Sequence, residues 1–366
     1  MENIKLGLIG SGARIKSMYL PVFESVGVEV AGFTTRDSEK GQVFSQNTGL
    51  KYFDNAENMI QATNIDYFLV AVAMNANATI VDELLKFGKP IIVETPLAWS
   101  KGQTVRLVNK AKQLGVKIYV MEQFPYMPYE LLRRQIFEDG VFGNIYAVYN
   151  DFSAYKYHGI ARARHYLDSE PKSVRCETIK FSLTSSHIST NPDWQMANVK
   201  FTNGSRLFYV FSAEYWGSAI CHPLTFRIYG EKATMVDDTI KVAIDANSEA
   251  ITAKVIHEKT EKGATKRLSI SIPSLKEYVW ENPYAKDHLS DEQTAVAILL
   301  NSVFTNGANG LLPYTADDFA VDIEINQAMN ISDARAGASV GFPLNENLQK
   351  ALKLMSYKFW KNKLIK

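Results

Sequence analysis

Cysteine and long apolar runs are both scarce in this sequence. Its 366 residues include two cysteines, Cys176 and Cys221, which are too few for a disulfide framework and favour a reducing compartment. No apolar stretch has the length of a membrane-spanning helix, and the first apolar run is short and stops at Gly10, unlike that of a signal peptide. We therefore expect a cytoplasmic protein with no membrane partner.

Clusters of positive charge and metal-ligand spacings are missing as well. The net charge is +1, and the one basic run, residues 358–363, is typical of a solvated helix end, so nucleic acid is not an expected partner. The six histidines follow no zinc spacing, and we expect no metal. No Gly-x-Ser-x-Gly elbow is present, which argues against a serine nucleophile. The expected partner is a small-molecule substrate.

Length and composition favour more than one domain. With 46% hydrophobic and 22% charged residues the chain can bury a large core, yet it is too long for a single compact domain. The pattern of apolar residues changes near Met121. We place a dinucleotide-binding domain at residues 1–122, a substrate and oligomerisation domain at 123–343, and a C-terminal helix at 344–366.

The first third of the chain alternates strand-like apolar runs with segments of helical spacing. Predicted strands cover residues 4–9, 29–34, 66–71, 90–93 and 117–121, and predicted helices cover residues 15–26, 38–47, 76–87 and 101–114. Repeated strand-helix-strand units predict a doubly wound parallel sheet with helices on both faces.

A glycine loop, Gly10-Ser11-Gly12, separates the first strand from the first helix. Glycine lets the backbone turn sharply and approach a ligand without an intervening Cβ, and the helix that follows points its N–H groups at an anion. Such a junction is typical of dinucleotide binding. A strand can also end in glycine for steric reasons alone, and both interpretations stay open.

The second domain shows a different pattern, in which strands follow one another too closely for crossover helices. Predicted strands cover residues 144–152, 172–183, 195–201, 206–213 and 224–229, with predicted helices at 157–167, 291–304 and 315–336. This spacing predicts an α+β domain with a mostly antiparallel, open sheet. One broad face of that sheet is expected to support a homodimer or homotetramer.

One strand ends in Val93-Glu94-Thr95-Pro96-Leu97. Together with the glycine loop and with residues 138–145, 201–205 and 229–233, this segment resembles the Gfo/Idh/MocA family of nicotinamide-dependent oxidoreductases over nearly the whole chain. The resemblance implies an N-terminal Rossmann domain, in which this strand is the fifth, followed by the α+β domain. It also implies a nicotinamide near Glu94.

The chain departs from the family at several functional positions. The family's strand usually ends in Glu-Lys-Pro, whose lysine helps to move the proton, and Thr95 stands in its place. The family's Asp-x-Gly-x-His helix reads Tyr157-His158-Gly159-Ile160-Ala161. Ile15 occupies the third glycine position, and residues 72–77 replace Thr-Pro-Asn-x-x-His. The scaffold is kept, whereas the usual proton-transfer residues are not.

The loss of the lysine matters because a positioned acid or base contributes about 10²- to 10⁴-fold and threonine does not ionise near neutral pH. Three explanations stay open: another residue moves the proton, the substrate needs little help, or the chain binds coenzyme without turnover. The candidate replacements are Tyr157 and His158, unless both only pack. Glu94 lines the nicotinamide site or caps a helix, and Glu122 follows a strand at the edge where ligands gather.

The second strand ends in Thr34-Thr35-Arg36, without the acidic residue that NAD-preferring folds usually place there. Arg36 can pair with a 2′-phosphate, so NADP is favoured and NAD stays open, with Asp37 as a helix cap or a ribose ligand. The predicted coenzyme-binding residues are Gly10, Ser11, Gly12, Ala13, Arg14, Ile15, Thr34, Thr35, Arg36, Ala73, Asn75, Asn77, Glu94, Thr95, Pro96 and Glu122.

The expected function is hydride transfer between a nicotinamide coenzyme and a small polar, sugar-like substrate, with Tyr157, His158, Glu94 and Thr95 as the catalytic candidates. Two alternatives accompany it. The chain could reduce an imine or a conjugated double bond, since both accept hydride without a dedicated acid. It could also bind coenzyme as a sensor or scaffold.

Overall fold

The computed structural model describes residues 4–181, 193–212, 224–308 and 310–345, and the chain divides into two compact units. The first unit contains the chain up to Leu131 together with His257–Leu268 and Trp280–Ala320, and the second unit contains the rest. The predicted domain boundaries after residues 122 and 343 stay a prediction. The predicted C-terminal helix and the basic run at 358–363 lie outside the described residues from residue 346 onward.

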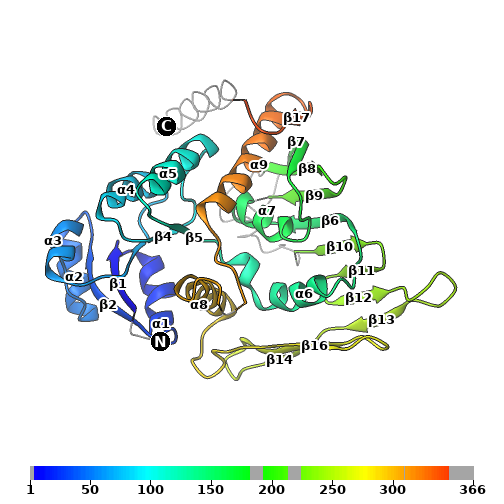
Figure 1. Ribbon diagram of the computed structural model, residues 1–366, viewed down its shortest axis with the longest axis horizontal. Coiled ribbons are helices and arrows are strands. Elements are labelled where there is room, and N and C mark those ends of the chain that lie inside the picture. The colour runs from blue at the N-terminus through cyan, green and yellow to red at the C-terminus, as the bar shows by residue number, and fades with distance from the viewer. Residues whose placement is uncertain (1–3, 182–192, 213–223, 309, 346–366) are drawn as a thin grey trace. The chain divides into compact units, whose positions relative to one another are not determined.

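A five-stranded parallel sheet forms the centre of the first unit (Figure 1). Its order is β2-β1-β3-β4-β5, and every neighbouring pair is parallel, which confirms the doubly wound prediction. The strands are β1 (Ile4–Ile9), β2 (Val28–Thr34), β3 (Tyr67–Val70), β4 (Ile91–Glu94) and β5 (Ile118–Met121). The strand that ends at Glu94 is the fourth along the chain, so its expected number, the fifth, was wrong. Between β2 and β3 the chain forms two helices and one isolated bridge, Phe33 to Tyr52.

Helical segments connect these strands. They are η1 (Ile15–Tyr19), α1 (Leu20–Phe23), α2 (Ser38–Thr48), α3 (Ala56–Ala62), α4 (Asn77–Leu84), η2 (Leu85–Phe87), α5 (Lys101–Gln113) and η3 (Phe124–Tyr126), followed by α6 (Pro128–Glu138). The first helix ends at Phe23 and not at the predicted residue 26. Its first part, η1, is π-helical, and π-helical turns are frequent at functional sites. Neither α3 nor α6 was predicted.

Helix α8 (Asp291–Phe304) comes from the far end of the sequence but belongs to the first unit. Ser290 starts it with a capping box, in which its hydroxyl accepts from the backbone N–H of Gln293 and the Gln293 side chain returns to the N-cap backbone. The helix packs against η1, α1 and β5. In Figure 1, α8 lies below β4 and β5, whereas α4 and α5 lie above them. This packing brings the first turn of α8 to the helix that follows the glycine loop.

A nine-stranded sheet dominates the second unit, in the order β13-β12-β11-β10-β6-β9-β8-β7-β17. The prediction of a mostly antiparallel sheet is confirmed, and the one parallel pair among the described strands of this nine-stranded sheet is β6 with β9. The strands are β6 (Ile145–Phe152), β7 (Pro171–Lys180), β8 (Asp193–Phe201), β9 (Arg206–Phe211), β10 (Phe226–Gly230), β11 (Ala233–Val236), β12 (Thr239–Val242), β13 (Ile251–Lys254) and β17 (Val340–Gly341). A separate three-stranded sheet, which was not predicted, contains β14 (Ile256–Lys259), β15 (Thr265–Ser271) and β16 (Glu277–Glu281).

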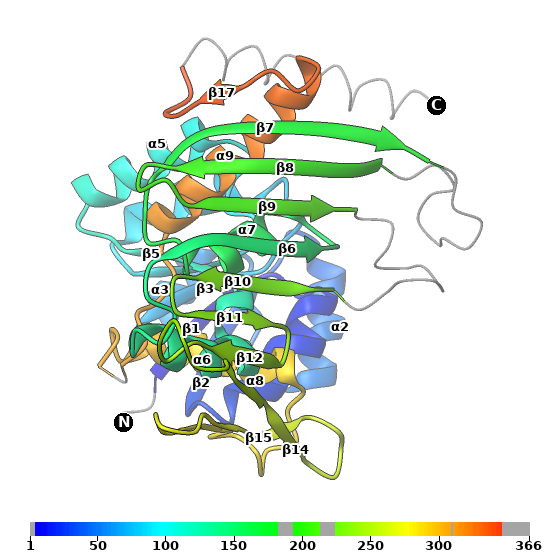
Figure 2. The same cartoon turned by 90° about the vertical axis from the view of Figure 1, so that its right-hand side faces the viewer.

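The nine-stranded sheet has one covered face and one open face. Helix α7 (Lys156–Arg164) packs on β6 and β9, behind the strands in Figure 2, and the buried Asn150 of β6 donates to the carbonyl of Gly159 on that helix. The last long helix is α9 (Ala316–Ala334). Because side chains alternate along a strand, Tyr149 points away from α7. It is 39% exposed and stacks on Phe208 of β9 with 4.5 Å between ring centroids, so apolar groups gather on the open face.

Two expected absences concern membranes and metals. Among the described residues, no helix combines the length and the apolar character needed to cross a membrane. Over the same part of the chain, no group of three or more His, Cys, Asp or Glu side chains is placed to hold a metal ion.

Candidate active site

The glycine loop lies at the carboxyl end of β1, and the surroundings of its two glycines differ. Gly10 has φ +118°, and a Cβ there would lie 2.3 Å from the carbonyl oxygen of Ala71, so sterics alone require glycine. Its N–H donates to the carbonyl of Thr34 at the end of β2. Gly12 is exposed, and no atom lies within 4 Å of a Cβ built on it. The loop therefore leaves open space where a phosphate would approach the backbone, and the residues fit a dinucleotide.

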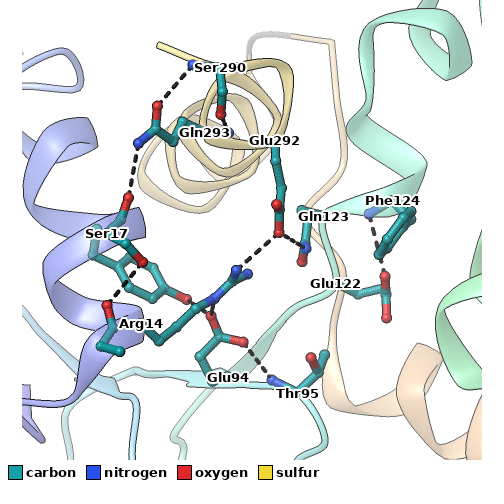
Figure 3. Close-up of polar contacts among 12 residues, drawn as sticks. Arg14, Ser17, Glu94, Thr95, Glu122, Gln123, Phe124, Ser290, Glu292 and Gln293 are labelled. Atoms are coloured by element: carbon teal, nitrogen blue, oxygen red, sulfur yellow. Dashed lines mark hydrogen bonds and ion pairs between the residues drawn. The ribbon is translucent and has the colours of Figure 1, made fainter. Parts of the chain in front are cut away.

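A carboxylate at the end of β4 organises the side chains near this loop (Figure 3). Glu94 accepts from the Nε of Arg14 at 2.5 Å and from the hydroxyl of Tyr19 at 2.7 Å, both through Oε1. Its other oxygen accepts from the backbone N–H of Thr95 at 3.0 Å. The side chain of Glu94 is 10% exposed and that of Arg14 is 34% exposed. Three predicted site residues, Arg14, Glu94 and Thr95, therefore meet at one place.

Helix α8 contributes a second carboxylate that the sequence analysis missed. Glu292 accepts from the Nη1 of Arg14 at 3.0 Å and from the Nε2 of Gln123 at 2.9 Å, and Figure 3 shows it above the guanidinium. Gln293 donates to the carbonyl of Ser17 in η1 at 2.9 Å, which ties the same turn of α8 to the helix after the glycine loop. Within the described residues, the buried Oε1 of Gln123 has no hydrogen-bond partner. An amide acceptor thus remains available beside the network.

Asn77, a predicted coenzyme ligand, lies fully buried beneath the end of β4. Its Nδ2 donates to the carbonyls of Glu94 and Pro96 at 2.9 and 3.0 Å, and its Oδ1 has no hydrogen-bond partner among the described residues. Asn77 therefore positions the turn that carries Thr95. Thr95 itself is partly buried at this turn.

Two side chains of this network, Arg14 and Tyr19, hold their protons firmly near neutral pH. Burial disfavours the charge on Arg14, but the electrostatic interactions with Glu94 and Tyr19 and the hydrogen bonds to Glu94 and Glu292 together outweigh it, and the pKa of Arg14 rises above its ordinary value. Burial, followed by the negative charge of Glu94, raises the pKa of Tyr19 well above its ordinary value. Arg14 stays charged and Tyr19 stays protonated, and Thr95 has no titratable group.

The remaining predicted coenzyme residues line the carboxyl edge of the same sheet. Ala13, Ala73, Asn75 and Arg36 are exposed, Ser11 and Thr35 are partly buried, and Ile15, Thr34 and Pro96 are buried. Asp37 caps α2 by accepting from the N–H of Lys40 at 3.1 Å. Glu122 is fully buried after β5, and its carboxylate accepts from the N–H of Phe124 at 3.4 Å.

The other two catalytic candidates belong to the second unit. Tyr157 and His158 are buried on α7, 2% and 7% exposed, with their rings edge to face at 4.5 Å, and Tyr155 stacks on Tyr157. The neighbouring Lys156 was not predicted. Its Nζ donates to the Oε1 of Gln195 at 2.7 Å and to the Oδ1 of Asn330 at 2.6 Å. Burial lowers the pKa of Lys156 to about 8, so α7 carries an amine that titrates near neutrality.

Residues 4–122 match the family model GFO_IDH_MocA, described as an oxidoreductase family with an NAD-binding Rossmann fold. This part of the chain belongs to the Gfo/Idh/MocA family. The match covers the glycine loop, Glu94 and Thr95, and it ends at Glu122. The expected family is therefore confirmed for the sheet that carries the Arg14 and Glu94 network.

Curated relatives of this chain are about a quarter identical to it over the aligned residues. An uncharacterized protein of Saccharomyces cerevisiae, YMR315W, is 26% identical over 133 residues, which are 35% of this chain and 38% of that protein. A dTDP-3,4-didehydro-2,6-dideoxy-alpha-D-glucose 3-reductase of Actinomadura kijaniata is 25% identical over 154 residues, 40% of this chain and 46% of that protein. The chain thus matches less than half the length of these relatives.

Solved structures extend the likeness in fold to nearly the whole chain. A levoglucosan dehydrogenase in complex with NADH and levoglucosan has a TM-score of 0.69 at 16% identity, covering 94% of this chain and all of that one. An oxidoreductase from Agrobacterium radiobacter in complex with NAD⁺, L-tartaric acid and magnesium has a TM-score of 0.68 at 15% identity, covering 93% and 98%. At such identities the likeness concerns the fold alone.

Proposed function

We propose that this chain is an NAD(P)-dependent oxidoreductase that transfers a hydride between a nicotinamide coenzyme and a small polar, sugar-like substrate. One observation carries the proposal: the open space above Gly12 at the carboxyl end of β1, in a segment that belongs to the Gfo/Idh/MocA family. The sugar-like substrate is supported by the presence of a dTDP-sugar reductase and a levoglucosan dehydrogenase among the similar proteins.

NADP is the preferred coenzyme of this proposal. Arg36 is exposed directly after β2, where a 2′-phosphate would lie, and Asp37 uses its carboxylate to cap α2 and to pair with Lys40 at 3.3 Å. The acidic group that would hold ribose hydroxyls in an NAD site is therefore engaged elsewhere. Arg36→Ala is expected to weaken NADPH binding and to leave NADH binding unchanged, and equal losses for both coenzymes would contradict the preference.

The proton must come from a group other than Thr95. When bound, the nicotinamide supplies or accepts the hydride, while Arg14 supplies a fixed positive charge at the end of β4. We keep Tyr157 and His158 as the proposed proton carriers, because a phenol or an imidazole can exchange a proton where threonine cannot. If Tyr157→Phe and His158→Gln each leave turnover of an identified substrate unchanged, this assignment fails.

Coenzyme binding gives the direct test of the proposed function. Titration of NADPH fluorescence with the purified chain is expected to show saturable binding, and Gly12→Asp is expected to remove it by placing a carboxylate where the pyrophosphate lies. Because no atom surrounds the position of a Cβ at Gly12, this variant should keep the urea unfolding curve of the parent chain. A folded parent chain that binds neither reduced coenzyme at millimolar concentration would refute the function.

A second candidate function follows from the lack of a ready proton donor among Arg14, Tyr19 and Thr95. Arg14 and Tyr19 hold their protons and Thr95 has none to give, which favours a hydride acceptor that needs no dedicated acid, such as an imine or a conjugated double bond. A Thr95→Lys variant that gains sugar dehydrogenase activity would favour the sugar-like substrate. Coenzyme binding without turnover of either class would instead indicate a sensor or scaffold.

We also infer self-association through the open face of the nine-stranded sheet. Met196 of β8 is 45% exposed, and on the same face Tyr149 stacks on Phe208. Exposed apolar side chains on a sheet face are typical of protein interfaces. Sedimentation is expected to show a dimer or tetramer, and Tyr149→Lys should shift it toward the monomer. The cytoplasmic location stays a prediction from the sequence.

A further inference from the structure

The Arg14–Glu94 ion pair closes over the end of one strand. Arg14 follows β1 and Glu94 ends β4, and β3 lies between these two strands in the sheet. The 2.5 Å contact therefore crosses the carboxyl end of β3. In open α/β sheets this edge is where ligands bind. The guanidinium of Arg14 thus lies at the edge of the sheet where the proposed function puts a pyrophosphate.

Glu292 makes this cluster negative. Arg14 carries one positive charge and contacts two carboxylates, those of Glu94 and Glu292, so the three side chains sum to −1. A pyrophosphate is itself an anion and gains from Arg14 only if the guanidinium is free to face it. The carboxylates already accept from the Nε and Nη1 of Arg14, so a pyrophosphate that pairs with these sides of the guanidinium competes with one of them.

The two carboxylates are held very differently. Glu94 is 10% exposed and accepts three hydrogen bonds, two of which come from Tyr19 and the backbone of Thr95 and are independent of Arg14. Glu292 is 46% exposed and, among the described residues, has besides Arg14 a single donor, the amide of Gln123. Water can solvate the Glu292 carboxylate once it leaves, whereas Glu94 would lose most of its partners. Glu292 is the carboxylate that can be exchanged.

We propose, resting on the proposed function, that Glu292 sets the affinity for the coenzyme by competing with its pyrophosphate for the guanidinium of Arg14. Glu94 keeps Arg14 in position from below, and Glu292 occupies the outer side until a stronger anion displaces it. The coenzyme must replace the Arg14–Glu292 contact before it gains its own. Glu292 thus weakens binding and speeds release of the coenzyme.

The test compares dissociation constants for NADPH, measured by fluorescence and by calorimetry on the full chain. Glu292→Gln is expected to bind about two- to fivefold more tightly, the range for a partly exposed ion pair, and the gain should shrink in high salt. Glu258→Gln is the matched control, because Glu258 of β14 is also 46% exposed and pairs with Arg267 of β15 at 3.2 Å. The control should bind like the parent chain.

A double-mutant cycle separates competition from simple repulsion. In an Arg14→Met background, Glu292→Gln should no longer improve binding, because its carboxylate no longer has a guanidinium to occupy. If Glu292→Gln improves binding equally in both backgrounds, the effect is general repulsion and the competition is refuted. If the parent chain binds and Glu292→Gln does not tighten binding, the competition fails while the proposed function stands. If no folded variant binds coenzyme, both fail.

Discussion

Two partly buried cations, one in each unit, are held by opposite kinds of partner. Arg14 in the first unit contacts the carboxylates of Glu94 and Glu292 at 2.5 and 3.0 Å. Lys156 in the second unit contacts the neutral amide oxygens of Gln195 and Asn330 at 2.7 and 2.6 Å. The direct partners of the first cation are charged, and those of the second are neutral dipoles.

This difference decides which cation can change its charge. For Arg14, the nearby carboxylates outweigh burial and raise the pKa, so the charge is permanent. For Lys156, burial outweighs the more remote Cys176, Asp333 and Asp193 and lowers the pKa to about 8. The first unit thus contains a fixed electrostatic anchor and the second a group that loses its proton in the physiological range.

The largest effect on the free energy of unfolding is expected when the carboxylate of Glu94, which contacts the permanently charged Arg14, is removed. Glu94→Ala removes the acceptor of the Tyr19 hydroxyl and, among the described residues, leaves Arg14 with Glu292 alone. It should lower the free energy of unfolding by about 3 kcal/mol, the lower end for a broken buried pair because Arg14 is 34% exposed. Urea unfolding measures this loss. Glu258→Ala, which breaks a pair whose carboxylate is 46% exposed, should cost within about 1 kcal/mol. Equal losses in the two variants would show that Arg14 is not anchored by charge.

A smaller effect of opposite sign is expected at Lys156. Its pKa is about 8 in the folded chain, below the ordinary lysine value of 10.5 expected for the unfolded chain. Between these two values the unfolded chain binds more protons, so stability should rise with pH by up to about 1.4 kcal/mol per unit. Lys156→Met removes this slope and should raise the free energy of unfolding near pH 7 by about 1–2 kcal/mol.

The measurement for Lys156 is a series of urea unfolding curves between pH 7 and pH 10. Lys254→Met serves as the control, because Lys254 is 70% exposed and pairs with Asp238 at 3.3 Å. The control should keep the pH slope of the parent chain. If Lys156→Met also keeps that slope, the amine of Lys156 does not titrate where its burial indicates, and the contrast with Arg14 disappears.

The sequence predicted much of the first site because its residues lie at the ends of strong apolar runs. The strand at 91–94 stands out as apolar residues before Glu94, and the glycine loop follows the apolar run of β1. In a parallel sheet those ends meet at one edge, so Arg14, Glu94 and Thr95 could be assigned to one site without the structure. Their individual partners could not, since the Arg14–Glu94 pair joins residues 80 positions apart.

The missed residues depend on tertiary packing. The bounds of α8 were predicted correctly at 291–304, but nothing local in that helix indicates that its first turn faces η1, so Glu292 went unnoticed. Gln123 and Tyr19 have no local feature that marks them as site residues. They belong to the site because they donate hydrogen bonds to Glu292 and Glu94, respectively. For Lys156 the sequence contains a weak signal, a lysine at the start of a predicted helix. Only Tyr157 and His158 of that helix were considered as candidates. Its amide partners on β8 and α9 lie far away in sequence.

The smallest effect on stability is expected at the outer carboxylate. Glu292→Gln removes one charge from Arg14 but leaves the buried pair with Glu94, and the new amide can still meet Gln123, so the free energy of unfolding should change by less than about 1 kcal/mol. Urea unfolding of this variant and of Glu94→Ala compares how much each of the two carboxylates that contact Arg14 contributes to the free energy of unfolding. A loss at Glu292 as large as that at Glu94 would mean that both carboxylates hold Arg14 equally, and then neither could yield to a ligand without a cost to the fold. A small loss, with the large one confined to Glu94, leaves Arg14 anchored on one side and exchangeable on the other.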